Sequence, residues 1–391
     1  MKILMLAPEP FFQPRGTPIS VYFRIKALSD LGHEVDLVTY HLGEERSFKN
    51  LRIHRTPPLF FIKKIKVGPS FTKIPLDFLL FCRATGLLLA RSYDLIFSHE
   101  EAAWFGTFLA RMRKIPHVYD MHSSLPQQLE NFQFSRSLIL RKIFTALERY
   151  VLCNSQSIIV ICLDLLHKLE REGVAHKGIL AENFLDFDYP AYSRIQVQQE
   201  REKFAPKGEK IVLYAGNFEP YQGISLLLEA GAELKNRPVV LLLVGGKQTH
   251  VEDMKRKAKE LNIGERVHFI GQVAPSRIPL YLSMTDALVS PRISGTNTPL
   301  KIYSFLKSGK PLVATNLWTH TQILTEKIAV LVEPDPQNLA RGLIFALFDK
   351  DASRRAQNAK TFADNEFTFA NYKRKITQAL EGALANSKKD V

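Results

Sequence analysis

The feature that most constrains the fold of this chain is a regular alternation of short apolar runs with longer helical patterns. The short runs have the length and composition of buried strands, and the segments between them carry apolar residues at helical spacing. Such alternation produces parallel strands whose helical connections cover both faces of the sheet. The sequence therefore predicts an α/β fold of two Rossmann-like halves, each with a parallel sheet and helices on both faces.

The expected elements follow the chain in order. Strands are expected at 1–7, 34–39, 51–55, 94–97, 117–119, 157–161 and 178–181, and again at 210–216, 239–244, 267–270, 286–289, 311–314 and 329–332. Helices are expected between them, notably at 19–31, 76–91, 101–113, 135–153 and 163–172, and a last helical segment at 354–385.

The strand–helix rhythm breaks once, between Asn183 and about Lys207, where Asp186-Phe187-Asp188-Tyr189-Pro190 and a Gln-rich run intervene. At 391 residues the chain is long for a single core, so two domains are expected. We predict an N-terminal domain over residues 1–185, completed by a C-terminal helix over 370–391, and a C-terminal domain over residues 200–370.

Positive charge is concentrated in one segment. The chain has a formal net charge of +14. The segment from Lys49 to Arg91 contains nine Lys or Arg residues and one acidic residue, Asp77, so its own net charge is +8. Bulky apolar residues accompany these cations, which fits a surface lying on anionic lipid. Nucleic acid is a weaker rival, since no nucleic-acid-binding motif is present. A solvated basic face over an ordinary helix core is the third interpretation.

Other features favour a cytoplasmic protein. Cys82, Cys153 and Cys162 lie in apolar stretches without metal-ligand spacing, which predicts reduced core thiols. Met1 and Lys2 lead directly into a strand, which leaves no room for a signal peptide. No apolar run reaches about 18 uncharged residues, so a membrane span is not expected.

The stretch Ser290–Ser304 has the sequence pattern of a phosphate site. It follows an expected strand and precedes a helical pattern, with Thr298 as the expected N-cap and Pro299 in the first turn. A helix N-terminus offers free N–H groups and the positive end of the dipole to an anion. Arg292 and Lys301 flank that position and would add two cationic donors.

The N-terminus repeats this pattern. A strand, then the basic loop Arg15-Gly16-Thr17, then a helix form a second strand–loop–helix junction. Gly16 suits close backbone approach to a phosphate, although turn geometry alone would also explain it. Two such junctions suggest that the two halves share one phosphorylated ligand.

Ligands of open α/β sheets bind at the carboxyl ends of the strands, so polar residues just past other strands are further candidates. In the first half these are His99, Glu100, Asp120 and His122. In the second half they are Gly216, Asn217, Gln222 and Lys247. A lone histidine is more often structural, but its place past a strand favours a functional His122. Glu100 could orient an acceptor hydroxyl, or it could only place a negative charge in the first turn of a helix. Asp120 could cap or orient the His122 loop.

Four segments in order resemble the motifs of family-four retaining glycosyltransferases. Gly32-His33-Glu34-Val35 resembles their Gly-His-x-Val turn, and Asn183-Phe184-Leu185-Asp186 resembles their Asn-Gly-Val-Asp linker without the Gly. The run 214–223 is similar to their donor-diphosphate loop, and Gly309–Ala314 to their Gly-Lys-Pro-Val-Val-Ala strand. The resemblance covers most of the chain and implies the GT-B architecture, two Rossmann-like domains facing across a cleft.

The chain departs from that family at the usual Glu-x7-Glu pair, whose positions are Thr296 and Ser304 here. The Arg and Lys of the diphosphate loop are replaced by Asn217 and Gln222. Such losses fit an inactive homologue, or a subfamily in which Arg292 and Lys301 supply the missing cations. We favour the active enzyme.

The resemblance implies a retaining glycosyltransferase that moves a sugar from a nucleotide-sugar donor to a lipid-linked or glycan acceptor. We expect it at the inner face of the membrane, with peripheral contact to anionic lipid, without nucleic acid, and without a metal or other cofactor. An inactive sugar-nucleotide-binding protein stays open, as does a sugar-nucleotide isomerase. The expected catalytic residues are His122, Arg292 and Lys301. The expected donor contacts are Gly16, Thr17, Gly216, Asn217, Gln222, Thr296, Asn297, Thr298 and Ser304. The expected acceptor-side residues are Arg15, His99 and Glu100.

Overall fold

The computed structural model describes residues 1–13, 16–65, 70–127, 138–184 and 191–387. The chain divides into two compact units. Unit 1 contains Met1–Phe184 and Phe369–Val391, and unit 2 contains Leu185–Thr368. Arg15, Lys66 and the segment 185–190 of the expected linker lie outside the described residues.

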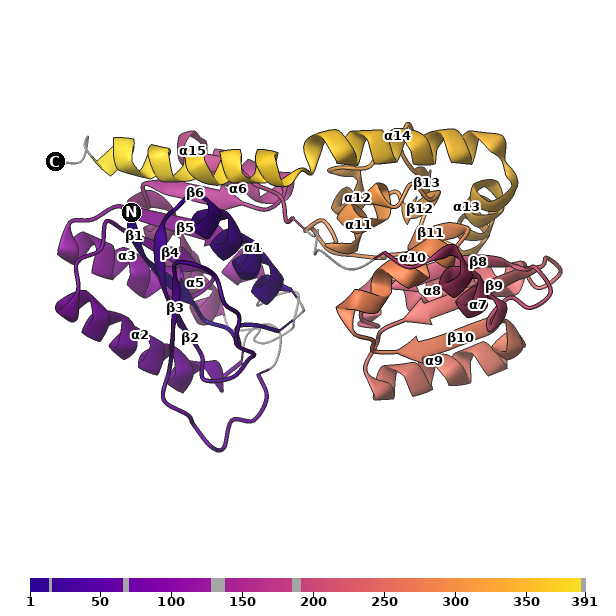
Figure 1. Ribbon diagram of the computed structural model, residues 1–391, viewed down its shortest axis with the longest axis horizontal. Helices are drawn as coiled ribbons and strands as arrows, with labels where there is room; N and C mark the ends of the chain where they lie inside the picture. The colour runs from indigo at the N-terminus through magenta and orange to yellow at the C-terminus, as the bar shows by residue number, and fades with distance from the viewer. Residues whose placement is uncertain (14–15, 66–69, 128–137, 185–190, 388–391) are drawn as a thin grey trace. The chain divides into compact units, whose positions relative to one another are not determined.

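Unit 1 is built on a seven-stranded parallel sheet with the order β3-β2-β1-β4-β5-β6-β7 (Figure 1). Its strands are β1 Lys2–Ala7, β2 Glu34–Thr39, β3 Leu51–Arg55, β4 Leu95–His99, β5 His117–Met121, β6 Ser157–Val160 and β7 Gly178–Leu180. Its helices are α1 Thr17–Asp30, α2 Lys73–Ala90, α3 Ala102–Arg113, α5 Leu138–Asn154, α6 Leu163–Arg171 and α15 Phe369–Ser387.

Alternate residues of the central strands serve two helical layers. Leu4 and Leu6 of β1 join a buried cluster with Leu76 and Leu80 of α2 and Leu109 of α3. Helix α3 also contacts α5, whereas α1 and α15 contact each other. The sheet is thus buried on both faces, which explains why its strands are continuous apolar runs.

Unit 2 is built on a six-stranded parallel sheet with the order β10-β9-β8-β11-β12-β13. Its strands are β8 Lys210–Ala215, β9 Val239–Val244, β10 Val267–Gly271, β11 Ala287–Ser290, β12 Leu312–Thr315 and β13 Val330–Val332. Its helices are α7 Arg194–Glu202, α8 Ile224–Glu233, α9 Gln248–Glu260, α10 Ile278–Met284, α11 Lys301–Lys307, α12 Trp318–Thr321, α13 Pro336–Phe348 and α14 Lys350–Glu366.

The second sheet is covered in the same way. Val212 and Tyr214 of β8 pack into a cluster with residues of α8 and α13. Ile211 and Leu213 point to the opposite cluster, which includes residues of α11 and α14. The predicted fold class is therefore confirmed: two α/β domains with parallel sheets and helices on both faces.

The expected strands agree with the observed ones to within two residues at each end. The last helical segment contains two helices, because Phe367 and Thr368 separate α14 from α15. The aromatic rings explain the break. Phe367 packs edge-on against Tyr303 in unit 2, with ring centroids 4.9 Å apart, whereas Phe369 packs against Phe184 in unit 1 at 5.3 Å.

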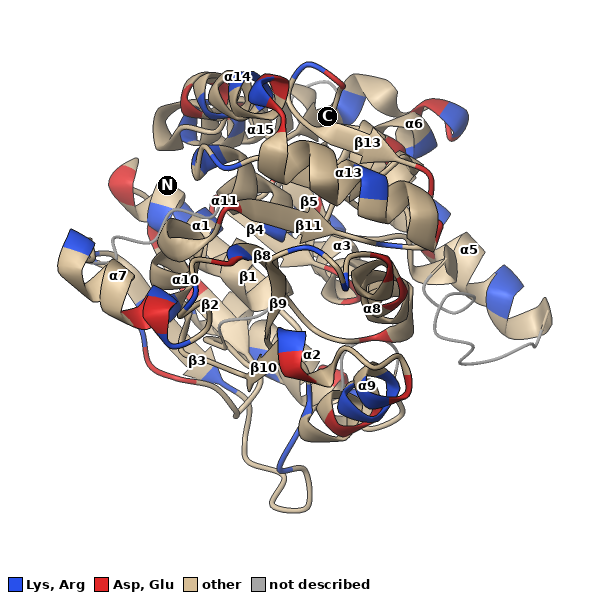
Figure 2. Cartoon of the chain, turned by 90° about the vertical axis from the view of Figure 1, so that its right-hand side faces the viewer, with Lys and Arg blue, Asp and Glu red and all other residues tan. Residues whose placement is uncertain are grey.

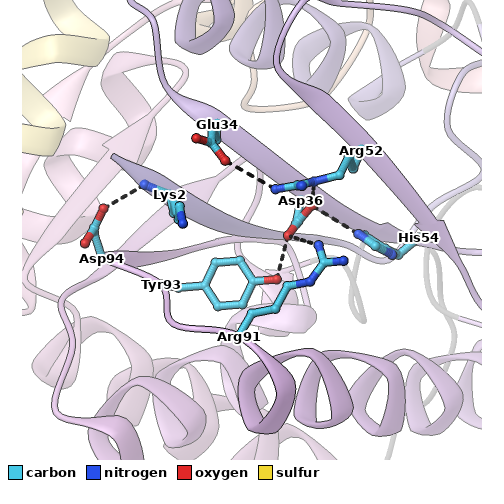
Figure 3. Close-up of polar contacts among 8 residues, drawn as sticks. All are labelled: Lys2, Glu34, Asp36, Arg52, His54, Arg91, Tyr93 and Asp94. Atoms are coloured by element: carbon cyan, nitrogen blue, oxygen red, sulfur yellow. Dashed lines mark hydrogen bonds and ion pairs between the residues drawn. The ribbon is translucent and has the colours of Figure 1, made fainter.

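A buried carboxylate fastens the edge of the unit 1 sheet (Figure 3). Asp36 on β2 is 2% exposed and accepts hydrogen bonds from Tyr93 Oη at 2.7 Å, Arg52 Nε at 2.8 Å and Arg91 Nη1 at 3.1 Å. His54 Nε2 lies 3.1 Å from the same carboxylate. Burial raises the pKa of Asp36, but the donors of Tyr93, His54 and Arg52 outweigh it and hold the pKa at about 2.

One expectation about the cysteines changes with the structure. Cys162 is buried, but Cys82 and Cys153 are exposed, so the prediction of three core thiols is wrong. Cys82 lies on α2 and Cys153 on α5. Both helices leave several bulky apolar side chains exposed, so the apolar stretches around these cysteines did not indicate burial. Charged residues of both signs are spread over helices such as α9 and α14 (Figure 2). Within the described residues, no helix is long and apolar enough to cross a membrane.

Candidate functional site

The strongest candidate site lies at the carboxyl edge of the unit 2 sheet and is centred on Lys301. This residue begins α11, and its ammonium group lies 3.8 Å from the centre of the Tyr214 ring. It also donates to Gln222 Oε1 over 3.3 Å. Burial, and then the nearby charge of Arg292, lower the pKa of Lys301 well below its ordinary value. The free protein therefore holds this ammonium group in an unfavourable environment that an anion would relieve.

Arg292 is the second cation of this site. It follows β11, and its Nη1 donates to the carbonyl of Asn297 at 2.8 Å and to Thr319 Oγ1 at 2.7 Å. The guanidinium carbon lies 5.2 Å from the Tyr221 ring centre, and Nε is buried without a hydrogen-bond partner among the described residues. Burial lowers the pKa of Arg292. The hydrogen bonds that the described residues make with the two cations all go to neutral groups.

Two glycines shape the backbone beside these cations. Gly216 has φ of +153°, and a Cβ atom at this position would lie 3.0 Å from Lys301 Nζ and 3.0 Å from Tyr214 Oη. Gly223 has φ of +73°, and a Cβ atom there would lie 1.8 Å from the carbonyl oxygen of Pro291. Both positions therefore require glycine, one for the space of the ammonium group and one for close backbone contact.

The two polar residues that replace the family's diphosphate cations differ in their surroundings. Gln222 is 5% exposed and faces Lys301, so the structure brings these two expected site residues together. Asn217 is exposed, and its Oδ1 accepts the backbone N–H of Glu219 at 3.2 Å. The carbonyl of Asn217 accepts Tyr214 Oη at 2.6 Å, so the residue shapes a turn. Lys247 forms an exposed ion pair with Glu219 at 2.8 Å.

The expected N-cap is wrong. Helix α11 begins at Lys301, and its cap residue is Leu300, so Thr298 lies two residues too early to cap it. The carbonyl of Pro299 accepts the N–H of Ile302 at 3.0 Å, so the chain turns into α11 after Thr298 without a bond from its side chain. Thr298 is instead 7% exposed, with an Oγ1 atom that has no hydrogen-bond partner among the described residues.

The remaining expected donor contacts of this loop make hydrogen bonds to neighbouring groups in the same unit. Ser304 Oγ donates to the carbonyl of Lys301 at 2.9 Å. The carbonyl of Thr296 accepts Gln322 Nε2 at 2.5 Å, and that of Asn297 accepts Thr319 Oγ1 at 2.7 Å. At the two positions where the family carries glutamates, the side chains are therefore hydroxyls.

A second polar cluster lies at the carboxyl ends of β4 and β5 in unit 1. His99 Nδ1 lies 3.1 Å from His122 Nε2, and both atoms lie close to Asp120 Oδ2, at 3.3 and 3.5 Å. Arg24 Nε donates to Asp120 Oδ2 at 2.8 Å, and Nη2 to Oδ1 at 3.2 Å. The Arg24 charge outweighs the effect of burial and holds the pKa of Asp120 well below its usual value. Burial lowers the pKa of His99 to about 3, so this ring is neutral.

His99, Asp120 and His122 are also the three groups whose ligand atoms could meet at one metal ion, since they lie within 4.8 Å of one another. They fit a metal poorly, because the Arg24 guanidinium already binds both oxygens of Asp120 and would repel a divalent cation. Asp120 therefore has Arg24 as its partner and lies beside both histidine rings.

The other expected residues of unit 1 lie around the same edge. Gly16 is exposed with φ of +52° and open space around it, and Thr17 begins α1. Glu100 does not lie in the first turn of α3, which begins at Ala102. It has a left-handed backbone with φ of +46°, and its carboxylate accepts Ser123 Oγ at 2.9 Å.

Several residues of these sites were not predicted from the sequence. Tyr214 lies within a strand and Arg24 within a helix, so neither stands out as a loop residue. His320 is buried, its Nε2 lies 2.8 Å from Ser290 Oγ, and burial lowers its pKa to about 3. Glu9 follows β1, and its place past a strand was the one signal that could have found it.

Comparison with known proteins identifies the class of both halves. Residues 14–188 match the family model of glycosyltransferase family 4, and residues 196–362 match that of glycosyl transferases group 1. These matches support a family-4 glycosyltransferase. The curated relatives of this glycosyltransferase include the α-monoglucosyldiacylglycerol synthase of Streptococcus pneumoniae, 24% identical over 89% of this chain and 78% of the relative. An uncharacterized glycosyltransferase of Methanocaldococcus jannaschii is 23% identical over 93% of each chain.

Solved structures of glycosyltransferases share the fold. Sucrose-phosphate synthase from Thermosynechococcus elongatus superposes with a TM-score of 0.77 at 22% identity, over 98% of this chain and 99% of that chain. Anabaena HepE in complex with UDP and glucose gives a TM-score of 0.75 at 20% identity, over 97% and 99%. The neighbours confirm the predicted GT-B type of fold for this glycosyltransferase.

Proposed function

We propose that this glycosyltransferase moves a sugar from a nucleotide-sugar donor to a membrane-associated glycan or glycolipid, with retention of configuration and without a metal ion. The observation that carries the proposal is the pair of cations Lys301 and Arg292 at the carboxyl edge of the unit 2 sheet. Both are desolvated, and both have neutral hydrogen-bond partners. A diphosphate is an anion of the right chemistry for two such donors.

The chemistry asked of these cations is electrostatic. When the sugar leaves, negative charge builds on the β-phosphate and positive charge on the sugar ring. Donors that are already in place stabilise that change without reorganisation. Lys301 and Arg292 would supply this stabilisation without a metal, with the backbone at Gly216 and the Gln222 amide beside them. The polar groups of Thr296, Asn297, Thr298 and Ser304 and the turn at Asn217 would complete the donor contacts.

Unit 1 would bind the acceptor and contact the donor sugar. We assign His122 to the donor sugar and His99 and Glu100 to the acceptor side, with Arg24 and Asp120 holding the histidines. Gly16 and Thr17 would contact the donor phosphates. Support comes from the placement of these groups at the carboxyl edge of a parallel sheet.

Membrane contact is proposed for the α2 surface, defined as Phe60, Phe61, Lys63, Lys64, Ile74, Phe78, Arg83 and Leu89. Its apolar side chains are strongly exposed, from 63% for Ile74 to 84% for Phe60. Along α2 the exposed Ile74, Phe78 and Leu89 follow helical spacing, although Leu76, Leu80 and Ala84 already supply the buried face. A helix that is apolar on both faces, with basic neighbours, suits the interface of an anionic bilayer. The relative named as an α-monoglucosyldiacylglycerol synthase agrees with a lipid acceptor.

The test is a thermal-shift screen over nucleoside diphosphates and their sugars, followed by turnover with the donor that stabilises most. We expect UDP or another nucleoside diphosphate to raise the melting temperature, and the matching nucleotide sugar to be consumed when membrane lipid is present. Stabilisation by none of these compounds would contradict the proposal.

The absence of both family glutamates favours one alternative, a sugar-nucleotide-binding protein without activity. Hydroxyls stand at Thr296 and Ser304, and the structure places no carboxylate there. The same screen separates the two functions. Tight binding of a nucleotide sugar without its consumption, over a panel of lipid and glycan acceptors, would support the inactive protein.

A further inference from the structure

Glu9 is a buried carboxylate to which the described residues offer no hydrogen bond. It lies two residues beyond the end of β1, its side chain is 6% exposed, and both Oε1 and Oε2 lack a partner. Its backbone is well held, since its carbonyl accepts Thr39 Oγ1 at 2.6 Å and the N–H of Tyr40 at 3.2 Å. The side chain is thus fixed in a place where it lacks the donors that buried carboxylates normally require.

The charged groups around Glu9 do not relieve this deficit. Lys73 is the neighbouring cation, but its ammonium group is bound to Glu101 at 2.8 Å. Glu100 is the neighbouring acid with the largest effect, and its carboxylate accepts Ser123 Oγ. Burial, and then the charge of Glu100, raise the pKa of Glu9. Negative charge is therefore disfavoured at this place, and both carboxyl oxygens of Glu9 remain acceptors without a donor among the described residues.

The place of Glu9 in the fold is that of a ligand site. Strands β1 and β4 are parallel neighbours, with Leu6 beside Ser98, so Glu9 and Glu100 leave the same edge of the sheet. The carboxyl edge is where open α/β sheets bind ligands. Lys73 begins α2, so the cluster also adjoins the first turn of the helix proposed to contact lipid. A membrane-borne headgroup could reach it from that helix.

We infer that Glu9 and Glu100 bind hydroxyl groups of a neutral sugar or polyol headgroup, and that they exclude phosphate from this part of the acceptor site. The inference rests on the proposed function and names the class of its acceptor. Hydroxyl groups supply the donors that Glu9 lacks, whereas a phosphate would bring a further anion beside two carboxylates. The α2 surface would attract anionic lipid in general, and the carboxylates would select a neutral headgroup among the lipids there.

The test is direct binding, measured by saturation-transfer NMR on the full chain without a donor. The probes are octyl β-glucoside below its critical micelle concentration and inositol 1-phosphate. We expect saturation transfer to the sugar-ring protons of octyl β-glucoside, and none to inositol 1-phosphate. Glu9→Ala should weaken octyl β-glucoside binding at least tenfold, since hydrogen bonds to charged groups are the stronger ones.

If the alanine variant fails to fold, Glu9→Gln keeps the shape of the side chain and replaces one acceptor oxygen with an NH2 donor. It should weaken binding about tenfold, because a hydroxyl donor then loses its acceptor. Glu45→Gln removes a 77% exposed carboxylate of the same unit and should bind as the wild type does. Three results would overturn the inference. They are no binding of octyl β-glucoside to the wild type, binding of the glucoside by both Glu9 variants as tight as by the wild type, and binding of inositol 1-phosphate as tight as that of the glucoside. Binding of the glucoside by a protein that consumes no nucleotide sugar would instead count against the proposed transfer alone.

Discussion

The ammonium group of Lys301 lies 3.0 Å from the point that a Cβ atom on Gly216 would take. Gly216 follows β8 and Lys301 begins α11, so the two residues lie next to each other at the carboxyl edge of the unit 2 sheet. A side chain at residue 216 would therefore crowd the cation in addition to straining the turn.

Gly216→Ala should displace Lys301 and lower the affinity for UDP about tenfold, with a loss of about 1–3 kcal/mol of folding stability from the strained backbone. Calorimetric titration with UDP and thermal melts measure the two effects. Gly208→Ala is the matched control, because Gly208 also has a left-handed φ of +79° but has open space around it. That variant should lose stability and keep its UDP affinity. Equal UDP affinity of the Gly216→Ala protein and the wild type would contradict the packing described.

Binding of UDP should be accompanied by proton uptake. The pKa of Lys301 is lowered in the free protein, mainly by burial, and a bound diphosphate favours the protonated amine. The affinity should therefore fall as the pH rises through the pKa of Lys301 in the free protein. The lowered pKa also affects folding stability. Below the folded pKa of Lys301 the buried charge reduces the stability of the free protein, and this reduction disappears as the pH rises to the pKa that Lys301 has in the unfolded chain.

Titration calorimetry at pH 8 in two buffers with different ionisation enthalpies measures the uptake. Lys301→Arg keeps the charge and removes the titration, so its binding heat should not depend on the buffer. An identical buffer dependence for the wild type and Lys301→Arg would show that the proton enters elsewhere.

Asp36 should make the protein sensitive to acid. Its folded pKa is about 2, below the unfolded value, so its stabilisation is present above about pH 4 and is lost as the pH falls toward 2. A shift of this size corresponds to about 2 kcal/mol. Asp36→Asn should therefore destabilise the protein by about 2 kcal/mol at pH 7 and by much less near pH 2. Urea melts across this range measure the difference.

The control for Asp36 is Asp94→Asn, which removes a carboxylate that accepts the N–H of Lys2 at 2.7 Å in an exposed contact. This change should cost less than about 1 kcal/mol. A loss of stability that is the same for Asp36→Asn at pH 2 and pH 7 would show that the ionised carboxylate is not what stabilises the sheet edge.

The α2 surface should bind vesicles in proportion to their anionic lipid, and salt should weaken the binding because it screens surface charge. Lys63→Glu with Lys64→Glu should reduce co-sedimentation, and Phe78→Ser should reduce it without changing the net charge. A matched control is Lys255→Glu on α9, which changes the charge of the other unit. Unchanged co-sedimentation of the first two variants would mean that the surface is only a solvated face.

The sequence predicted the strands closely because both sheets are buried on two faces, so each strand is a continuous apolar run between turn residues. It predicted poorly wherever tertiary contacts decide the outcome. The break between α14 and α15 follows from Phe367 and Phe369 packing into different units, and no helix-breaking residue marks it. Thr298 has the residue type of an N-cap, but α11 begins at Lys301 with Leu300 as its cap residue, and Thr298 Oγ1 has no hydrogen-bond partner among the described residues.

The candidate sites show the same division. Residues just past strands, such as His122, Gly216 and Arg292, could be found from their position alone. Partners that come from inside elements could not, because nothing in a single sequence shows that Arg24 of α1 meets Asp120 or that Tyr214 of β8 lies under Lys301. Glu9 shows the limit most clearly, since its significance is the absence of a donor, which only the three-dimensional surroundings reveal.

The central claim is that Lys301 and Arg292 bind the donor diphosphate, and the UDP dissociation constants of four proteins test it most directly. Lys301→Ala and Arg292→Ala should each raise the constant about 10- to 100-fold, because each removes a charged donor from a desolvated anion site. Lys310→Ala, past the end of α11 on the same segment, should bind UDP as the wild type does. Dissociation constants that agree among the wild type and all three variants would contradict the account.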